Sequence, residues 1–388
     1  MKFGLENMTS LVGALDHPER SFRSIHIAGT NGKGSVTAML EAALHRAGYA
    51  SARYTSPHLE RLEERFVLSE RPVDTSRLSE AVDEVREAVG RVQAAASSVF
   101  SPTFFECATA AAFVLFRAAR VEVAVIETGL GGRLDATNVI QPVATAITSV
   151  EFDHEALLGG TLPSIAREKA GIIKPDVPVV LGPLKPSAEK VILAVAAERR
   201  VSVVRGRELA GLTPALRGRH QRDNIAVTVA LTDVLNARGI PVPESALRDG
   251  IEHVDWPARL EHFFRGQHEF LLDAAHNPAG ARALAAYLRE SEWMDAALVF
   301  GALADKDAEG MLRELSAVVS SIVCTTAQSP RAASAEHLAA IARAIAQRRT
   351  VHEEAEPAAA LARARTLSHR VVIAGSMFLV GPLRGILR

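Results

Sequence analysis

The segment SIHIAGTNGKGS, Ser24 to Ser35, restricts the possible folds of this chain more than any other stretch. Ser24 to Ala28 is apolar enough for a short buried strand, and a helical run follows from Val36 to Ala47. A glycine-rich turn between a strand and a helix leaves several N–H groups unpaired at the positive end of the helix dipole. We therefore predict a phosphate-binding loop made of Gly29, Thr30, Asn31, Gly32, Lys33, Gly34 and Ser35.

This loop departs from the phosphate-binding pattern GxxxxGK[ST]. Its first glycine stands three residues before the second, and Gly34 separates Lys33 from Ser35. By itself, the segment leaves open the alternative of a plain glycine-rich turn with a solvated lysine.

Length and charge limit the organisation of the chain. Its 388 residues exceed what one hydrophobic core usually serves, so we predict two domains, at 1–254 and 258–388, on either side of Asp255-Trp256-Pro257. Basic and acidic residues number 44 and 45, a net charge of −1, so no overall field attracts nucleic acid or an anionic membrane. Any anionic ligand must be held by local groups.

Cysteine usage and the N-terminal residues point to a compartment. Cys107 and Cys324 are the only cysteines, too few for a disulfide framework or a thiolate metal site. No charged-then-apolar leader opens the sequence, and no apolar run reaches membrane-spanning length. We expect a cytoplasmic monomer that binds small molecules and has neither nucleic acid nor a membrane as partner.

Strands alternate with helices along nearly the whole chain, which predicts an α/β fold of parallel sheets with helices on both faces. Val121 to Ile126 and Val143 to Thr148 have the composition of central strands, and a charged segment, Glu60 to Glu70, leads to a helix from Thr75 to Ala96. A second alternation predicts a smaller doubly wound sheet, with strands at Leu260 to Phe264, Phe270 to Asp273, Ala297 to Phe300, Ser321 to Thr325, Thr350 to His352 and Val371 to Ala374.

Ligands of open parallel sheets bind beyond the carboxyl ends of the strands. Glu127 directly follows one predicted strand, and a carboxylate facing a phosphate loop is what nucleotide-bound Mg²⁺ requires, although a salt-bridged structural glutamate fits equally well. Asp153-His154 follows the next strand. Because histidine is an uncommon magnesium ligand, the chemistry alone favours a general base or a structural role for His154.

Three further positions carry charged or titratable groups. Lys169, taken alone, is typical of a cation at a helix end. Asp273 and His276 come at a strand end in the second domain, where they could reach a ligand held between the domains. Arg259, at the hinge, could stabilise phosphate charge as a planar cation or could be a solvated linker residue.

Nine motifs resemble, in order, those of the folylpolyglutamate synthase and dihydrofolate synthase branch of the Mur ligase superfamily. They cover nearly the whole chain: AGTNGKGS (Ala28 to Ser35), YTSPHL (Tyr54 to Leu59), ETGLGGRLDATN (Glu127 to Asn138), REKAGIIKP (Arg167 to Pro175), GRHQRDN (Gly218 to Asn224), ARLE (Ala258 to Glu261), DAAHNP (Asp273 to Pro278), GALADKD (Gly301 to Asp307) and AGSMFLVG (Ala374 to Gly381).

The resemblance implies a Mur-ligase-like domain that binds ATP and folate, followed by a glutamate-ligase domain. It also implies ATP-dependent amide formation, in which an acceptor carboxylate becomes an acyl phosphate and the amino group of L-glutamate attacks it. Closure of the two domains would bring the reactants together. The acceptor would be dihydropteroate, a folate or both, with ATP and Mg²⁺, two ions being expected.

Site residues follow from the resemblance by motif. It implies magnesium ligands at Ser56, Glu127 and His154, with Ser35 as a further candidate, and so reverses the chemical preference stated above for His154. ATP would be bound by the phosphate loop together with Asn224, Arg259 and Asp273. Lys169 matches a lysine that carries a carbamate. The catalytic residues would be Lys33, Lys169, Arg259 and His276.

The remaining implied sites concern the two other substrates. Phe105 is suited to stack on a flat heterocycle. L-Glutamate would bind to His276 and Ser376. The folate pocket would be lined by Thr103, Phe104, Phe105, Glu106, Leu134, Asp135 and Ala136.

The sequence also departs from the family pattern. Ala258 precedes the hinge arginine where a glycine is usual, and Phe378 stands where tyrosine is common. The chain begins almost at the family's GLE stretch, so we expect part of the pteridine pocket to be rebuilt or open. Two alternatives stay in view: a Mur-type ligase acting on another carboxylate, and a nucleotide-binding protein of the same fold without ligase activity.

Overall fold

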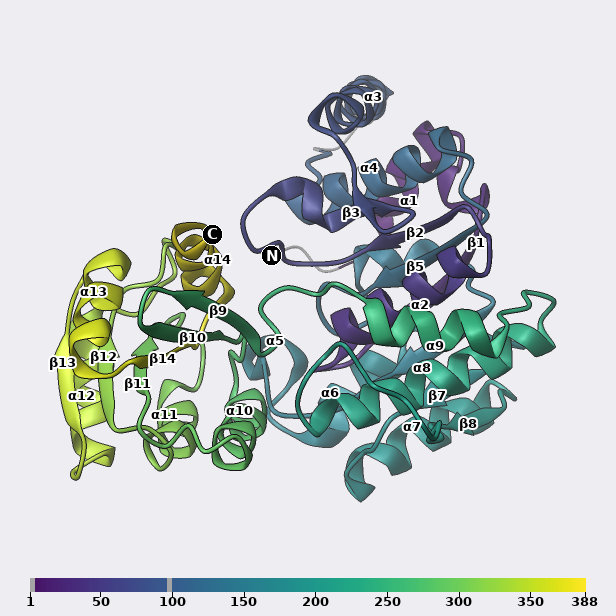
Figure 1. Ribbon diagram of the computed structural model, residues 1–388. Helices are drawn as coiled ribbons and strands as arrows, with labels where there is room; N and C mark the ends of the chain where they lie inside the picture. Colours follow the sequence, from purple (N-terminus) through teal and green to yellow (C-terminus); the bar gives the residue numbers. More distant parts are fainter. Residues whose placement is uncertain (1–3, 96–99) are drawn as a thin grey trace. The chain divides into compact units, whose positions relative to one another are not determined.

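The computed structural model of the chain describes residues 4–95 and 100–388 (Figure 1). The chain folds into two compact units. The first holds the chain up to Ala215 together with Gln221–Asp255, and the second holds Leu216–His220 and Trp256–Arg388. Each unit contains its own sheet.

The sheet of the first unit has eight strands. All neighbouring pairs are parallel except those that β3 makes with β2 and β4. β1 lies at its centre, hydrogen-bonded to β5 on one side and to β6 on the other. In spatial order the strands are β4 (Arg71–Pro72), β3 (Phe66–Leu68), β2 (Ser51–Tyr54), β5 (Val123–Glu127), β1 (Arg23–Ala28), β6 (Ala144–Ile147), β7 (Val179–Leu181) and β8 (Val203–Arg205).

Helices pack on this sheet through buried apolar side chains. One cluster joins Met8, Phe113 and Phe116 to Tyr54 and Ile126 of the strands. The helices are α1 (Glu6–Ala14), α2 (Lys33–Arg46), α3 (Thr75–Ala95), α4 (Phe104–Ala118), α5 (Glu155–Leu158), α6 (Leu162–Ala170), α7 (Pro186–Glu198), α8 (His220–Ala237) and α9 (Glu244–His253), with short 3₁₀ turns η1 (Pro18–Arg20), η2 (Leu62–Arg65) and η3 (Ala136–Val139).

The α/β class and the parallel sheets are confirmed, and three local expectations need correction. The charged segment 60–70 contains η2 and the antiparallel strand β3, because Phe66 and Val67 bury their side chains within an otherwise polar run. The helix α2 begins at Lys33, three residues before Val36. α9 lies in a stretch for which no element was predicted, and it packs against α2. The last residue of the helix expected over 75–96 lies outside the described residues.

The second unit has a six-stranded sheet whose edge strand β9 runs antiparallel to β10, so this sheet is not wholly parallel. Leu284, Met311 and Leu338 join α10, α11 and α12 to one hydrophobic cluster with the strands. The strands, in spatial order, are β13 (Thr350–Glu353), β12 (Ser321–Cys324), β11 (Ala297–Phe300), β14 (Arg370–Ala374), β10 (His268–Leu272) and β9 (Glu261–Arg265). The helices are α10 (Pro278–Glu290), α11 (Ala308–Ser316), α12 (Ala335–Ile345), α13 (Pro357–Leu367) and α14 (Met377–Leu387).

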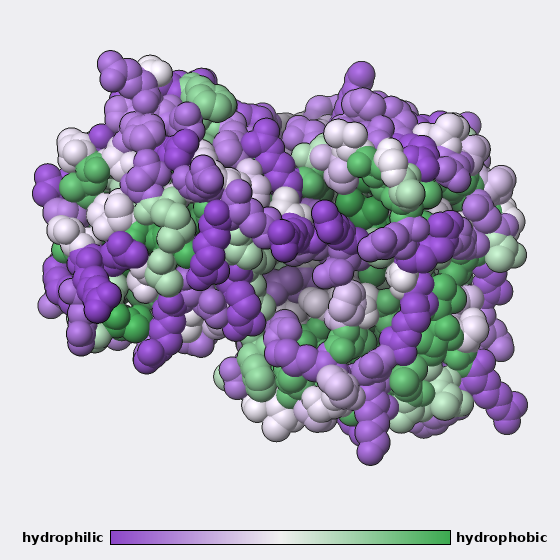
Figure 2. All heavy atoms as spheres, turned by 60° about the horizontal axis from the view of Figure 1, so that its bottom comes forward, coloured by the Kyte–Doolittle hydropathy of each residue, from purple (hydrophilic) through white to green (hydrophobic). Residues whose placement is uncertain are grey.

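Hydrophilic side chains predominate on the face shown in Figure 2, with hydrophobic ones between them. None of the helices in the described parts of the chain is long and apolar enough to cross a membrane.

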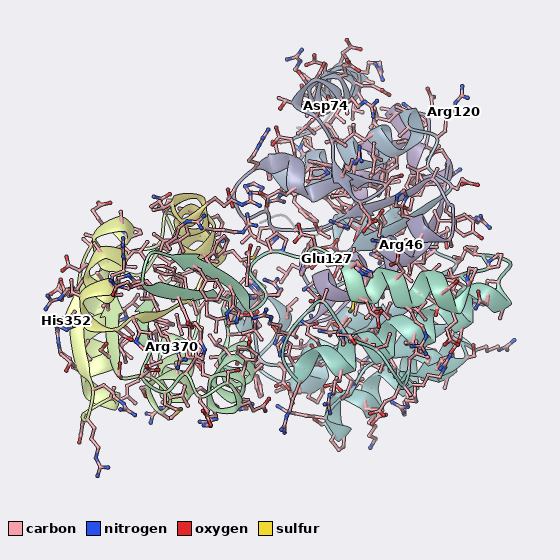
Figure 3. All side chains as sticks on the ribbon, viewed as in Figure 1. Arg46, Asp74, Arg120, Glu127, His352 and Arg370 are labelled. Atoms are coloured by element: carbon pink, nitrogen blue, oxygen red, sulfur yellow. The ribbon has the colours of Figure 1, made fainter. Side chains whose placement is uncertain are left out.

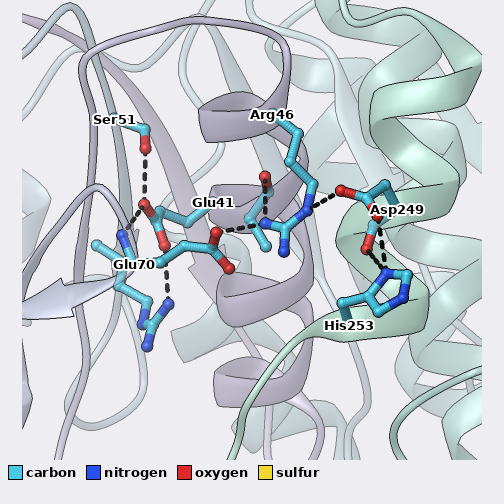
Figure 4. A network of polar contacts seen from close by, with 8 residues as sticks. Glu41, Arg46, Ser51, Glu70, Asp249 and His253 are labelled. Atoms are coloured by element: carbon cyan, nitrogen blue, oxygen red, sulfur yellow. Dashed lines mark hydrogen bonds and ion pairs between the residues drawn. The ribbon is translucent and has the colours of Figure 1, made fainter.

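A buried polar network ties α2 to the sheet (Figure 4). Glu41 is fully buried and accepts hydrogen bonds from the Ser51 hydroxyl at 2.6 Å and from the backbone N–H of Glu70 at 3.1 Å. Its other carboxylate oxygen pairs with Arg53 at 2.8 Å. One turn further on, Arg46 pairs with both Glu70 and Asp249, and so connects α2 to α9.

We expect Glu41→Ala to lower the free energy of unfolding by about 3–5 kcal/mol, because it leaves the buried guanidinium of Arg53 without its carboxylate. Asp83→Ala is the matched control, since Asp83 and Arg86 form a solvent-exposed pair on α3 that contributes less than about 1 kcal/mol. Urea denaturation of both variants measures the difference. Equal losses for the two would contradict a special role of the buried pair.

Candidate active site

The predicted phosphate loop connects β1 to α2. Gly32 adopts a left-handed conformation, φ 86°, and a Cβ at this position would come within 2.2 Å of the Asn224 side-chain oxygen, so only glycine fits. The N–H groups of Lys33, Gly34 and Ser35 lie in the first helical turn, where the helix offers them no acceptor. No side chain caps this end and no acidic residue lies in the first turn. The geometry is suited to an anion.

Strand pairing brings the predicted site segments of the first unit together. Parallel pairing sets Ile27 of β1 beside Glu127 of β5, and Ala28 beside Ile147 of β6. The segments that leave these three strands therefore meet at one edge of the sheet, where open α/β sheets bind ligands. The Thr30 N–H donates to the Ser149 carbonyl at 2.9 Å, which fixes the loop after β1 to the loop after β6.

Two lysines and one carboxylate converge on this loop. Lys33 donates to the carbonyls of Gly29 at 3.2 Å and Thr30 at 3.3 Å, and its Nζ lies 3.7 Å from Oε1 of Glu127. Figure 3 labels Glu127. Lys169, at the end of α6, donates to the same Gly29 carbonyl at 2.8 Å. Glu127 and Lys169 are 5% and 3% exposed, so their charges are poorly screened by solvent.

The amino group of Lys169 has a lowered pKa because of its surroundings. Burial, and after it the nearby charge of Lys33, lowers the pKa of Lys169 to about 7, against the smaller opposing effects of Asp153 and Asp135. A substantial fraction of this amine is therefore neutral near pH 7, so it can act as a nucleophile.

Gln221 is a site residue that the sequence interpretation did not single out. It is buried on α8, where it accepts a hydrogen bond from the Asn224 side chain at 2.8 Å. Its own amide donates to the Ser35 hydroxyl over 3.4 Å. Gln221 therefore orients two residues predicted to bind ATP and metal. Its place within the motif GRHQRDN was the available signal.

Ser56 and His154 follow strands at the same edge of the sheet. Tyr54 pairs with Ile126, so Ser56 lies just beyond the end of β2, next to Glu127 at the end of β5. His154 precedes α5, and its Nε2 lies 3.8 Å from Asp153. Within the described ranges, no three His, Cys, Asp or Glu side chains cluster closely enough to hold a metal by themselves.

Asp135 is held by a buried chain of hydrogen bonds that begins at His26. The Thr137 hydroxyl lies 2.5 Å from Oδ1 of Asp135 and 2.8 Å from Nε2 of His26. Burial lowers the pKa of His26 to about 3, with Lys174 adding to the effect, so the ring is neutral. Because Thr137 donates its one hydroxyl proton to the carboxylate, His26 must donate through Nε2. A histidine within the apolar strand SIHIA was the signal for this contact.

The residues predicted to bind folate lie around the start of α4 and the start of η3. The ring of Phe105 packs against Gly129 so closely that a Cβ added to this glycine would lie 2.4 Å from the ring. The centroid of the same ring is 6.1 Å from that of Tyr54. Thr103 and Glu106 instead form the capping box of α4, with bonds of 3.2 and 2.6 Å. Phe104 is 61% exposed. Leu134 and Ala136 flank Asp135 at the start of η3.

Asp273 organises the loop that carries Arg259 in the second unit. Its carboxylate oxygens accept hydrogen bonds from the backbone N–H groups of Leu260 at 3.0 Å and Ala275 at 2.9 Å. Burial raises the pKa of Asp273, and Arg259 opposes this shift. Its observed contacts are therefore structural, and contact with ATP stays a prediction.

The same loop is also tied to the last helix. Glu261 accepts from the Ala258 N–H at 2.8 Å and forms a two-pronged ion pair with Arg384 of α14, at 2.8 and 2.9 Å. Ala258 and Leu260 both have positive φ, 54° and 51°, a conformation that costs a non-glycine residue about 1–2 kcal/mol. The loop holds Arg259 between two strained residues.

The two residues predicted to bind L-glutamate follow adjacent strands. His276 lies beyond β10 and Ser376 beyond β14, and these strands pair in parallel. The Gly375 N–H donates to the Ala275 carbonyl at 2.9 Å, which fixes the two strand ends to each other. Ser376 caps α14, accepting from the Phe378 N–H at 3.2 Å, and Nδ1 of His276 lies 2.9 Å from the Ala274 carbonyl.

Comparison with known proteins identifies the family. The model "Mur ligase, glutamate ligase domain" matches residues 258–377. A dihydrofolate synthase/folylpolyglutamate synthase of Bacillus subtilis is 34% identical over 366 residues, covering 87% of this chain and 84% of that protein. The chain belongs to the dihydrofolate synthase/folylpolyglutamate synthase family. The resemblance seen in the motifs is thereby confirmed, and with it the class of ATP-dependent ligases.

Solved structures of the family agree with the fold. A folylpolyglutamate synthase of Mycobacterium tuberculosis, complexed with ADP and AMPPCP, superposes with a TM-score of 0.93 at 33% identity over 99% of this chain and 95% of that one. A bifunctional folylpolyglutamate synthase/dihydrofolate synthase of Yersinia pestis, complexed with AMPPNP and a manganese ion, gives a TM-score of 0.87 at 31% identity over 100% and 94%.

We expect Ala258→Gly to raise the free energy of unfolding by about 0.5–1 kcal/mol, because glycine adopts φ 54° without a Cβ clash and the gain exceeds the extra chain entropy. Ala359→Gly, at an exposed position within α13, should instead lower it by about 1 kcal/mol. Thermal and chemical unfolding of the two variants provide the measurement. A loss of stability in both would show that the loop is not strained at Ala258.

Proposed function

We propose that this ligase adds L-glutamate to dihydropteroate, to a folate, or to both, through an acyl phosphate formed from ATP. The observation that carries the proposal is the meeting of the Gly29–Ser35 loop, Lys33, Lys169 and Glu127 at one edge of the first sheet, in a chain of this family. Phosphoryl transfer depends mostly on positioning and charge stabilisation, which these groups supply.

The chain's residues have distinct tasks in this proposal. The free N–H groups of the first turn of α2 bind phosphate oxygens, and Lys33 neutralises part of their charge. Arg259, a planar cation on a fixed loop, stabilises charge that develops during transfer. His276 and Ser376 bind and orient L-glutamate in the second unit, while Phe105 and Asp135 hold the heterocycle of the acceptor in the first.

The donor set fits a divalent metal with nucleotide. Glu127 is a buried carboxylate beside the phosphate loop, and Mg²⁺ takes only one or two carboxylates when phosphate oxygens and water complete its shell. Ser35, Ser56, Glu127 and His154 would hold one or two ions. Bound Mg²⁺ supplies neutralisation of the phosphate oxygens.

Lys169 is proposed to carry a carbamate, which replaces a cation by an anion close to the metal ligands. A neutral amine adds to CO₂ and releases one proton, and the pKa of about 7 provides that neutral amine near physiological pH. The burial of Lys169 beside Gly29 supports this role, because an unmodified lysine gains little from such a site.

Phosphate release is the direct test of the function. With ATP and Mg²⁺ present, release should require L-glutamate and an acceptor, either dihydropteroate or a folate, and omission of glutamate or of the acceptor should reduce it to background. Dependence on glutamate with a different acceptor would support the alternative of a Mur-type ligase for another carboxylate. Nucleotide binding without any substrate-dependent release would support a non-catalytic protein of the same fold.

We expect Lys169→Ala to abolish turnover, a loss of at least about 100-fold, while nucleotide binding by calorimetry stays close to that of the parent. Lys190→Ala, at an exposed position on α7, is the control and should keep full activity.

The proposed carbamate leads to a second prediction about Lys169. Because its formation needs the neutral amine, activity should rise as the pH rises through about 7, and it should fall in CO₂-depleted buffer and return with bicarbonate. Turnover near the parent level in Lys169→Ala would remove Lys169 from the mechanism.

A further inference from the structure

Arg65 is a buried cation without a carboxylate partner. Three arginines in the described residues are less than 9% exposed: Arg53, Arg65 and Arg384. Arg53 pairs with Glu41, and Arg384 pairs with Glu261. No carboxylate oxygen in the described chain lies within 4.0 Å of Arg65, and residues 1–3 and 96–99 include no Asp or Glu. Buried charges in proteins are normally paired, so this one lacks an expected anion.

Neutral groups hold the Arg65 side chain in place. Its Nε donates to Nδ1 of His58 at 3.0 Å, and its guanidinium lies over the Phe104 ring, 5.4 Å from the centroid. The Tyr54 hydroxyl lies beside it. Burial, and then the charge of Arg65, lowers the pKa of His58, so His58 accepts the hydrogen bond as a neutral ring. This support orients the guanidinium without neutralising it.

Aromatic rings and the carboxylate of Glu127, which lies beside the phosphate loop, are near Arg65. Tyr54 stacks near Phe105, and Phe104 exposes 61% of its surface although Arg65 covers one side of its ring. Glu127 is near enough to act electrostatically on Arg65. A ligand with a flat ring and an acidic end would place the ring on the aromatic side chains and the acid on the guanidinium.

We propose that Arg65 binds the carboxylate of the acceptor substrate, the group that ATP phosphorylates. The inference rests on the proposed function, since it takes the acceptor to be an aromatic acid. A guanidinium pairs with a carboxylate through two parallel hydrogen bonds, and this geometry would orient the carboxylate oxygens for attack. The γ-phosphate of ATP is the other source of oxyanions at this site. The acceptor is favoured because Arg65 contacts the aromatic side chains of Phe104 and Tyr54. The phosphates of ATP already have binding groups in Lys33 and the N–H groups of the first turn of α2.

The test compares two ligands in two proteins. The ligands are dihydropteroate and its analogue in which hydrogen replaces the carboxylate, and the proteins are the parent and Arg65→Gln. The parent should prefer dihydropteroate by about 10- to 100-fold in equilibrium binding, and Arg65→Gln should bind the two ligands about equally. In turnover, Arg65→Gln should raise the KM for dihydropteroate and leave that for ATP unchanged.

Other outcomes would overturn the proposal. A preference for dihydropteroate that persists in Arg65→Gln would remove Arg65 from carboxylate binding. Weaker binding of AMPPCP by Arg65→Gln than by the parent, with the binding of ADP unchanged, would assign Arg65 to the γ-phosphate. Failure of the parent to bind either dihydropteroate or a folate would overturn the proposed function, and this inference with it, whereas the first two outcomes leave the proposed function intact.

Stability of the free protein separates ligand binding from a structural role. Because the charge of Arg65 has no counter-ion, Arg65→Gln should unfold at the same temperature as the parent or higher. Arg65→Lys should also fold and should bind dihydropteroate less tightly than the parent, since it keeps the charge but loses the two-pronged geometry. Arg77→Gln, an exposed pair member on α3, controls for loss of an arginine. A marked loss of stability or failure to fold in Arg65→Gln would make Arg65 structural.

Discussion

The parallel pairing of β1 with both β5 and β6 is the constraint on which the first unit depends. It places three strand ends side by side, so that segments about 20 to 120 residues apart in the sequence supply one group of polar side chains. The Gly29 carbonyl shows how tightly these segments meet, because it accepts hydrogen bonds from both Lys33 and Lys169. Two lysines at one carbonyl repel each other when both are charged, so the charge of Lys33 helps to lower the pKa of Lys169, while Asp153 and Asp135 oppose the shift.

Much of this arrangement could be predicted from the sequence. The glycines of the loop, the apolar strands and the motif order determine the class, the central strands and the strand-end positions of Glu127, Asp273 and His276. Strand order itself has no local signal, and neither does the antiparallel direction of β3 and β9. β3 was hidden because only Phe66 and Val67 are buried within a charged run.

Side-chain partnerships were harder to predict than positions. Glu106 and Asp273 were predicted to bind ligands, yet in the structure their carboxylates accept hydrogen bonds from backbone N–H groups, which the sequence cannot distinguish from ligand contacts. Conversely, the roles of Gln221, His26 and Arg65 follow from their burial together with their hydrogen-bond partners, which the sequence does not reveal. A polar residue within a motif has two possible uses, and geometry decides between them.

The ion pair between Glu261 and Arg384 joins residues that are 123 positions apart. During synthesis at about 5–20 residues per second, the loop that carries Arg259 precedes its partner by roughly 6–25 s. Until α14 has been made, Glu261 lacks the guanidinium of Arg384, whereas Asp273 and Ala274 can already form hydrogen bonds with the strained loop. Assembly of the second unit is therefore completed only when α14 packs back on a loop that was made long before it.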